Sequence, residues 1–498
     1  MTTLNRFTES PDTVFQATSS IEGNWLRRPL MEVTQALLGC ARAADFEFGE
    51  DTAIVAVQHM LWQTVDLFRA VGGMALRPEN IFALGKVYSN SVPVIRTLRE
   101  MGVTVTESSM PEPGRFSEYF EQDIKHLWRI VEDRLARRRI KRIIVLDDAG
   151  RCITNTPPNL IRQYIIGGVE QTSFGMFVFE KSPPAFAVTS WARSAVKLQI
   201  GGPIFSHCLI DKLNTEFQRG KSVEGKELGI IGLGSIGIGM ANLAERQGHK
   251  VMFYDPNPDL QIPQYLENRV TRLDSLEELM LRCDDVLGCS GRNPFKYKWP
   301  MEYRPGIRLF SGSSGDQEFG PIIRELKRKP SFRVAHDTWD ITSNDGPSGP
   351  IFIAYHGYPY NFVSRGGEAV PTHIVQLETG GLLAGLMQAR SYLALYENGR
   401  EQNTGIHRMS PAAQRFVFET WLTAMKEQRI DVRECYGYDP AMLRAAQKNS
   451  WLVENTEPNP AAGYEPNRNI EDVMRRLIAM DTSPANFSQL ELPCVEAD

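Results

Sequence analysis

Long hydrophobic runs are missing from this sequence, and so is an N-terminal apolar segment. No apolar run approaches the roughly 18 residues that a membrane-spanning helix needs. The first residues, MTTLNRFTESPDTV, lack the apolar stretch of a signal peptide. We therefore expect no membrane partner and a cytoplasmic location.

Paired cysteines and an excess of basic charge are missing as well. The seven cysteines are scattered and include no CxxC pair, so the sequence indicates neither a zinc site nor a disulfide framework. The net charge of −5 argues against a nucleic-acid partner. His336, Asp337 and Asp340 lie close together in AHDTWD, but their spacing matches no known metal site, so we expect no metal.

Short apolar runs alternate with amphipathic stretches along most of the chain. AIVAV at 53–57 is typical of a buried strand, residues 116–139 have helical spacing, and RIIVLDD at 142–148 is a further strand. A second series of this kind begins near residue 227. The pattern predicts an α/β fold with two doubly wound (Rossmann-like) parallel-sheet domains and a helical C-terminal extension.

A glycine motif opens the second series. Gly232, Gly234 and Gly237 form G-x-G-x-x-G between the apolar strand LGIIG and a helix. The first glycine makes a tight turn, the second lets the backbone approach a pyrophosphate, and the third allows helix–strand packing. Asp255 ends the next strand, where an acid binds ribose hydroxyls. The motif predicts NAD as cofactor. Further cofactor-binding candidates are Ser235, Ile236 and Ser290.

The expected domain boundaries follow from these patterns. We predict four parts. They are a flexible arm at 1–25, a substrate domain at 26–200 to which residues at about 360–400 also belong, an NAD-binding Rossmann domain at 201–358, and a helical C-terminal extension at 400–498.

Several segments resemble S-adenosylhomocysteine hydrolase, an NAD-dependent enzyme that splits S-adenosylhomocysteine into adenosine and homocysteine. They are IVAVQHMLWQTV, NIF, VLDDAGRCIT, GGVEQTSFG, SAVKLQ, SHCLID and GLGSIGIG, in family order between about 50 and 390. The resemblance implies transient oxidation of a ribose 3′-hydroxyl and elimination across C4′ and C5′. It also implies catalytic roles for His59, Asp148 and Lys197, and contacts from Thr172 and Ser173 to the nicotinamide half of NAD.

The substrate-binding positions of that family are only partly kept. Glu170 is retained, Gln171 stands where the family has a second glutamate, and Tyr358 replaces a histidine. These three residues are the substrate-binding candidates. Gly201 and Gly202 stand where the family carries an Asp-Asn pair. We therefore expect a nucleoside or nucleoside thioether as substrate, with an altered or partial reaction such as that of a dehydratase or an epimerase.

Two other functions stay open at this point. The lost polar residues allow a catalytically degenerate NAD-binding protein with a regulatory or scaffold role. A D-2-hydroxyacid dehydrogenase shares the glycine loop and the two-domain layout, although no Arg-Glu-His order is found between 290 and 360. The family resemblance also implies a homo-oligomer, either a dimer or a tetramer.

Overall fold

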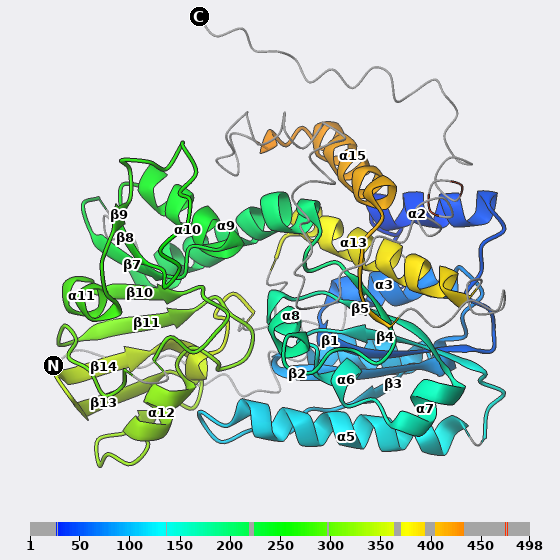
Figure 1. Ribbon diagram of the computed structural model, residues 1–498, viewed down its shortest axis with the longest axis horizontal. Coiled ribbons are helices and arrows are strands. Elements are labelled where there is room, and N and C mark those ends of the chain that lie inside the picture. The colour runs from blue at the N-terminus through cyan, green and yellow to red at the C-terminus, as the bar shows by residue number, and fades with distance from the viewer. Residues whose placement is uncertain are drawn as a thin grey trace, which may run out of the picture.

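The computed structural model describes most of the chain in two α/β units that lie side by side (Figure 1). The described residues are 26, 28–135, 137–218, 224–295, 298–362, 370–393, 404–432, 474 and 476. The expected arm at 1–25 lies outside them, as does most of the chain after 432. In the described ranges, no helix has both the length and the apolar character needed to cross a bilayer.

The first unit is built on a parallel sheet of seven strands in the order β15-β6-β5-β4-β1-β2-β3. The strands are β1 (Thr52–Met60), β2 (Ile81–Asn90), β3 (Thr104–Thr106), β4 (Arg142–Asp147), β5 (Ile165–Glu170), β6 (Ala187–Ser190) and β15 (Gly405–Arg408). Strand β15 pairs with β6 and was not identified from the sequence.

Helices cover both faces of this sheet. They are α2 (Glu32–Ala43), α3 (Trp62–Gly72), α4 (Val92–Glu100), α5 (Phe116–Leu135), α6 (Arg151–Thr154), α7 (Pro158–Gln163), α8 (Ser173–Phe179), α13 (Thr372–Ser391) and α15 (Pro411–Glu427), with the short turn η1 (Pro78–Asn80). Alternate side chains of β1 enter two separate cores, Ile54 on the face of α2, α3 and α13 and Val55 on the face of α5.

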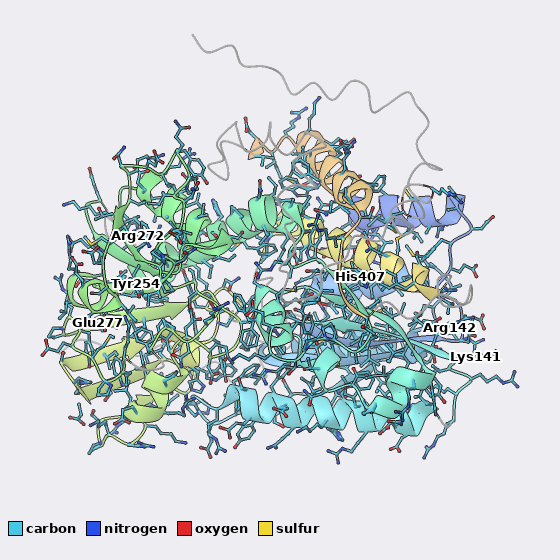
Figure 2. All side chains as sticks on the ribbon, in the orientation of Figure 1. Lys141, Arg142, Tyr254, Arg272, Glu277 and His407 are labelled. Carbon is cyan, nitrogen blue, oxygen red and sulfur yellow. The ribbon has the colours of Figure 1, made fainter. Side chains whose placement is uncertain are left out.

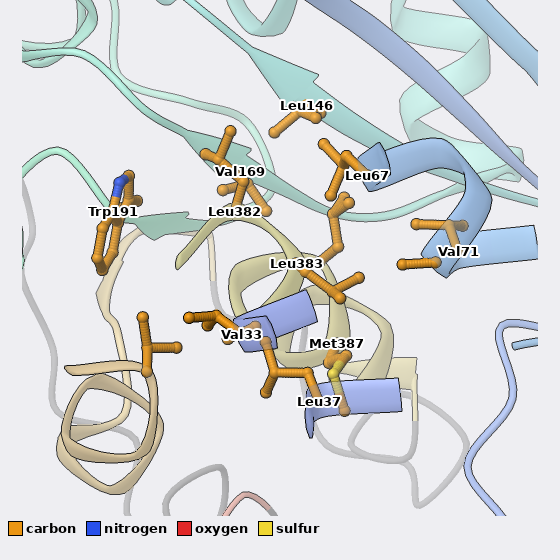
Figure 3. Packing of buried hydrophobic residues seen from close by; sticks show 14 of the residues in the cluster. Val33, Leu37, Leu67, Val71, Leu146, Val169, Trp191, Leu382, Leu383 and Met387 are labelled. Carbon is orange, nitrogen blue, oxygen red and sulfur yellow. The ribbon is translucent and has the colours of Figure 1, made fainter. Parts of the chain in front are cut away.

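Helix α13 lies across the first sheet, although it follows the second unit in the chain. Figure 3 shows its Leu382, Leu383 and Met387 among side chains of α2, α3, β4 and β5. A Cβ at Gly381 would lie 2.4 Å from the ring of Trp191, so the helix can approach β6 this closely only with glycine there. Because α13 packs on β5 and β6, the first turns of this helix lie near the carboxyl ends of the two strands.

The second unit contains a mixed sheet of eight strands in the order β12-β13-β14-β11-β10-β7-β8-β9. The strands are β7 (Glu227–Ile231), β8 (Lys250–Tyr254), β9 (Thr271–Arg272), β10 (Asp285–Gly288), β11 (Ile307–Ser311), β12 (Arg333–Val334), β13 (Ile341–Gly346) and β14 (Gly349–Ile353). Only the pairs that involve β13 are antiparallel among these strands. The expected fold class, two doubly wound sheets, is confirmed.

The helices of the second unit also lie on both faces of its sheet. They are η2 (Lys197–Gly201), α9 (Gly202–Lys212), η3 (Leu213–Gln218), α10 (Ser235–Arg246), α11 (Leu276–Arg282), α12 (Gly320–Leu326) and η4 (Ala354–Gly357). The π-helical turn η2 and helix α9 run from the first unit into the second and pack on α10. This crossing places Leu198, the residue after Lys197, against Ser235 at the start of α10.

Candidate functional site

The glycine loop connects β7 to α10. Gly232 has a φ of +89°, and this left-handed conformation turns the chain after the strand. A Cβ at Gly237 would lie 2.1 Å from the carbonyl oxygen of Gly232, whereas a Cβ at Gly234 would meet nothing within 4 Å. The loop therefore leaves open space beside Gly234. Ser235 and Ile236 begin α10, whose N-terminal N–H groups and dipole favour a phosphate.

Asp255 is held beside this loop at the end of β8. Its two oxygens accept backbone N–H groups of Leu233 at 2.8 Å and of Asn257 at 2.9 Å. A carboxylate accepts about four hydrogen bonds, so it can still bind ribose hydroxyls. Figure 2 labels Tyr254 and Arg272, the last residues of β8 and β9, and Arg272 donates to the carbonyl oxygens of Asp255 and Asn257. These residues fit the ribose and pyrophosphate of NAD.

Ser290 lies after β10, the strand that pairs with β7 on the side away from β8. A buried acid, Glu318, holds it in place. Its backbone N–H and its hydroxyl donate to Glu318 Oε1 at 2.6 and 2.7 Å. Burial raises the pKa of Glu318 to about 7, although hydrogen bonds from Ser290 and from Ser311 and Ser313 oppose the shift. The expected cofactor residue Ser290 is thus part of a polar network, which sequence analysis did not anticipate.

His59 and Asp148 meet at the carboxyl ends of β1 and β4 in the first unit. The sheet order reverses at β1, and ligands of open α/β sheets bind beside such a reversal. His59 Nε2 lies 3.0 Å from Asp148 Oδ2, and His59 Nδ1 lies 2.7 Å from the hydroxyl of Ser89. Burial lowers the pKa of His59, and the charge of Asp148 offsets this in part. The ring is therefore held neutral and oriented.

A buried lysine from β2 completes this pair. Lys86 Nζ donates to Asp148 Oδ1, and their side chains are 1% and 0% exposed. Burial alone would raise the pKa of Asp148, but Lys86 and His59 hold it well below its ordinary value. Burial is the largest single influence on Lys86 and would lower its pKa, but the charges and hydrogen bonds of Asp148 and Tyr88 together raise it. Asp148 is thus an anion held between the Lys86 ammonium group and the His59 imidazole.

The substrate-binding candidates from β5 have different surroundings. Gln171 donates to Asp148 Oδ2 and accepts from Gln58 at 2.8 Å, so it belongs to the cluster. Glu170 instead accepts the backbone N–H groups of Ala149, Gly150 and Thr172 and the hydroxyl of Thr172. Both of its oxygens therefore stabilise turns of the first unit.

Thr172 and Ser173, expected at the nicotinamide, lie at the start of α8. The hydroxyl of Thr172 accepts the N–H of Gly175 at 3.0 Å and caps the helix. Arg292, which follows β10, packs on Phe177 of the same helix at 3.9 Å from the ring centroid. Helix α8 is therefore part of the contact between the two units.

Lys197 joins the cluster to the glycine loop. Its ammonium group pairs with Glu378 of α13, and its charge lowers the pKa of His59. Leu198, the next residue, accepts a hydrogen bond from the hydroxyl of Ser235 through its carbonyl oxygen. Because Ser235 is the first residue of α10, the acid–base residues and the phosphate loop are connected through two consecutive residues.

Aromatic contacts close the junction between the two units. Tyr88 stacks on Tyr358 with ring centroids 5.0 Å apart, and its hydroxyl accepts the N–H of Gly315 at 3.3 Å. The ring of His59 stacks on Phe362 at 4.1 Å. Tyr358 is thus buried against Tyr88, and the first unit's strand ends face the second unit's loops.

Sequence analysis missed several members of this cluster. Lys86 stands in the apolar strand IFALGKVYSN and Glu378 in the apolar helix segment VQLETGGLLAGLM. A single charge inside an otherwise apolar element is the signal that could have indicated them, because buried charges are paired. Within the described ranges, no group of three or more His, Cys, Asp and Glu residues has the arrangement of a metal site.

Comparison with known proteins identifies the nucleotide-binding segment. Residues 210–293 match the NAD binding domain of D-isomer specific 2-hydroxyacid dehydrogenase. An uncharacterized Mycobacterium tuberculosis protein is 26% identical over 319 residues, which cover 62% of this chain and 58% of that protein. D-3-phosphoglycerate dehydrogenase of Haemophilus influenzae is 34% identical over 113 residues, 21% of this chain and 26% of that one.

Among solved structures, NAD+-bound 3-phosphoglycerate dehydrogenase of Entamoeba histolytica aligns with 71% of this chain and 98% of its own. The sequence identity is 14% and the TM-score is 0.32, a likeness too weak to support an inference.

These matches correct the family resemblance. The expected relation to S-adenosylhomocysteine hydrolase, and with it hydrolase or lyase chemistry on a nucleoside, is wrong, because the matching family is that of the D-2-hydroxyacid dehydrogenases. The segments that suggested it are short strand ends, pieces of η2 and α9 and a glycine loop, and such features occur in proteins of many activities. What the family match and the loop geometry establish together is an NAD-binding domain in this chain.

Proposed function

We propose that this chain is a NAD-dependent oxidoreductase, related to D-2-hydroxyacid dehydrogenases in its nucleotide-binding domain, that interconverts a secondary alcohol and a ketone. The observation that carries the proposal is the bond from Ser235 to the carbonyl of Leu198. It connects the start of α10 to Lys197, whose charge acts on His59. This link supports a single site that contains both a proton acceptor and a phosphate loop.

Each residue of the cluster has a separate task in this proposal. Bound NAD supplies the hydride acceptor for the alcohol carbon. His59 takes the hydroxyl proton at Nδ1. In the structure this atom is hydrogen-bonded to the hydroxyl of Ser89, which either gives way to the substrate hydroxyl or passes its proton on. Asp148 fixes the ring through Nε2 and stabilises the imidazolium that forms. Lys197 donates to the substrate oxygen while Glu378 holds its ammonium group in place.

The proposed partner is a small-molecule substrate. A homo-oligomer and a cytoplasmic location stay predictions, which size-exclusion chromatography with light scattering and cell fractionation would test.

The first experiment measures bound cofactor and hydride transfer. Purified protein is denatured and the released NAD is assayed, and the intact protein is then given NAD and a panel of alcohols while NADH absorbance is followed. His59→Gln should reduce kcat by about 100-fold or more, since general-base catalysis contributes on that order. His126→Gln, an exposed histidine of α5, is the matched control.

The pH profile gives an independent readout. Because burial lowers the pKa of His59, its base form persists below the ordinary histidine value of about 6.5, and the acid limb of kcat/KM should lie below that value. NAD binding without reduction by any alcohol would favour a regulatory or scaffold role. Equal activity of His59→Gln and His126→Gln would refute the role of His59.

A further inference from the structure

The charges around His59 cancel one another. Lys86 is neutralised by Asp148, and Lys197 by Glu378. His59 adds no charge, because burial disfavours the imidazolium. The Lys86–Asp148 pair is fully buried, and the side chains of Lys197 and Glu378 are only 23% and 14% exposed. In a site whose charges are already paired and which holds little water, binding a ligand with another unpaired charge costs free energy.

Glu378 offers an acceptor that the protein does not use. Its Oε1 pairs with Lys197, while its Oε2 is buried and has no hydrogen-bond partner among the residues that the structure describes. A buried carboxylate oxygen without a donor is costly, and a ligand hydroxyl that donates to it removes that cost. A ligand carboxylate has no proton to give and would be repelled there.

From this arrangement we propose that the substrate is an uncharged polyol, with its hydroxyketone as product, rather than a hydroxy acid. The reacting hydroxyl donates to His59, and a neighbouring hydroxyl donates to Glu378 Oε2. The inference rests on the proposed function and narrows its substrate class. The matched family model names hydroxy acids, but it covers residues 210–293, and both His59 and Glu378 lie outside that range.

The reaction balances with the groups named. The carbon of the reacting alcohol loses a hydride to NAD+, its oxygen loses a proton to His59, and the C–O single bond becomes a carbonyl. The proton passes from His59 to solvent. Lys197 and Glu378 take no part in this proton transfer, so the pair serves recognition while His59 carries the proton.

Matched pairs of compounds test the inference. Glycerol is compared with D-glycerate, and xylitol with D-xylonate, in two assays on the full-length protein with NAD. One assay follows NADH formation, and the other follows ligand binding by saturation-transfer NMR, which needs no turnover. Each polyol should exceed its acid in kcat/KM and in binding by about tenfold or more, the value of one buried hydrogen bond to a charged group.

The variant Glu378→Gln should change the binding of acids and of polyols in opposite directions. Without the carboxylate, Lys197 has a charge to offer, so acids should gain about tenfold in binding while polyols lose about tenfold. Glu121→Gln, which removes an exposed carboxylate paired with Lys125 at 2.9 Å on α5, is the control and should change neither. NAD affinity and the melting temperature show whether each variant is folded.

The outcomes separate this inference from the proposed function. Turnover of acids alone, or an equal loss for both classes in Glu378→Gln, would overturn the polyol assignment and leave the oxidoreductase standing. Preferential polyol binding without any NADH would support recognition of an uncharged polyol at this site, but it would refute the oxidoreductase and with it the hydroxyketone product. If none of the four compounds binds or is turned over, both the polyol assignment and the oxidoreductase are overturned.

Discussion

Removing the charge of Asp148 tests whether the buried cluster is held together as an ion network. In Asp148→Asn, the Lys86 ammonium group stays fully buried and loses its carboxylate. Breaking a buried pair in this way costs about 3–5 kcal/mol of folding free energy. We expect a loss of that size in urea unfolding followed by tryptophan fluorescence. Lys86→Met should cost less, because His59 can take up a proton and become the cation beside Asp148.

The double variant Asp148→Asn/Lys86→Met gives the decisive comparison. Replacing both partners of a buried pair is often nearly neutral, so the double variant should be clearly more stable than the sum of the two single losses predicts. Strictly additive losses would refute the claim that the two residues stabilise each other. A difference in the urea midpoint at unchanged slope shows that the comparison concerns stability alone.

The pH dependence of this loss has a definite sign. The folded pKa of Asp148 is depressed, so its contribution is fully present above the unfolded value of about 3.9 and disappears as the pH falls through the folded value. The difference between wild type and Asp148→Asn should therefore be largest near neutral pH and shrink below about pH 4. A difference that grows toward acid would contradict this account.

Three further outcomes are expected. Gly237→Ala should weaken NAD binding about tenfold or more in calorimetry, because its Cβ would meet the Gly232 carbonyl, while Gly72→Ala, with open space around it, should not. Asp255→Asn should raise NADP affinity relative to NAD, since the charge that repels a 2′-phosphate is gone. Between pH 5 and pH 8, wild type should lose about 2–3 kcal/mol of unfolding free energy relative to Glu318→Gln. The reason is that the raised pKa of Glu318 keeps it protonated in the folded state while it ionises in the unfolded chain.

The contacts that follow from sequence order alone are those between residues at or next to the ends of strands. The glycine loop and Asp255 lie within about one βαβ unit, so their contact follows from local order. His59 and Asp148 end two strands, and carboxyl ends of parallel strands meet at one edge. Lys197 precedes the strands of the second unit in the chain and Glu378 follows them, so no local pattern encodes their contact.

Glu170 shows the opposite limit. The family resemblance suggested that Glu170, the last residue of β5, binds substrate, yet three backbone N–H groups occupy its oxygens. Sequence order identifies a strand end but not whether a side chain there faces outward or back to the chain. Family assignment from short strand-end segments fails for a related reason, since such segments are constrained by the fold and only weakly by the reaction.

Gly202 changes its meaning once the fold is known. In the sequence it stood out as the loss of a polar residue, but a Cβ at this position would lie 1.9 Å from the hydroxyl of Ser235. The glycine thus allows Ser235 to reach the carbonyl of Leu198 and to join the phosphate loop to the Lys197 segment. Gly202→Ala should therefore weaken NAD binding and, with it, turnover by about tenfold or more. The same substitution at Gly201, where a Cβ would meet its nearest atoms only at 3.8 and 3.9 Å, is the control, and equal effects of the two would refute this coupling.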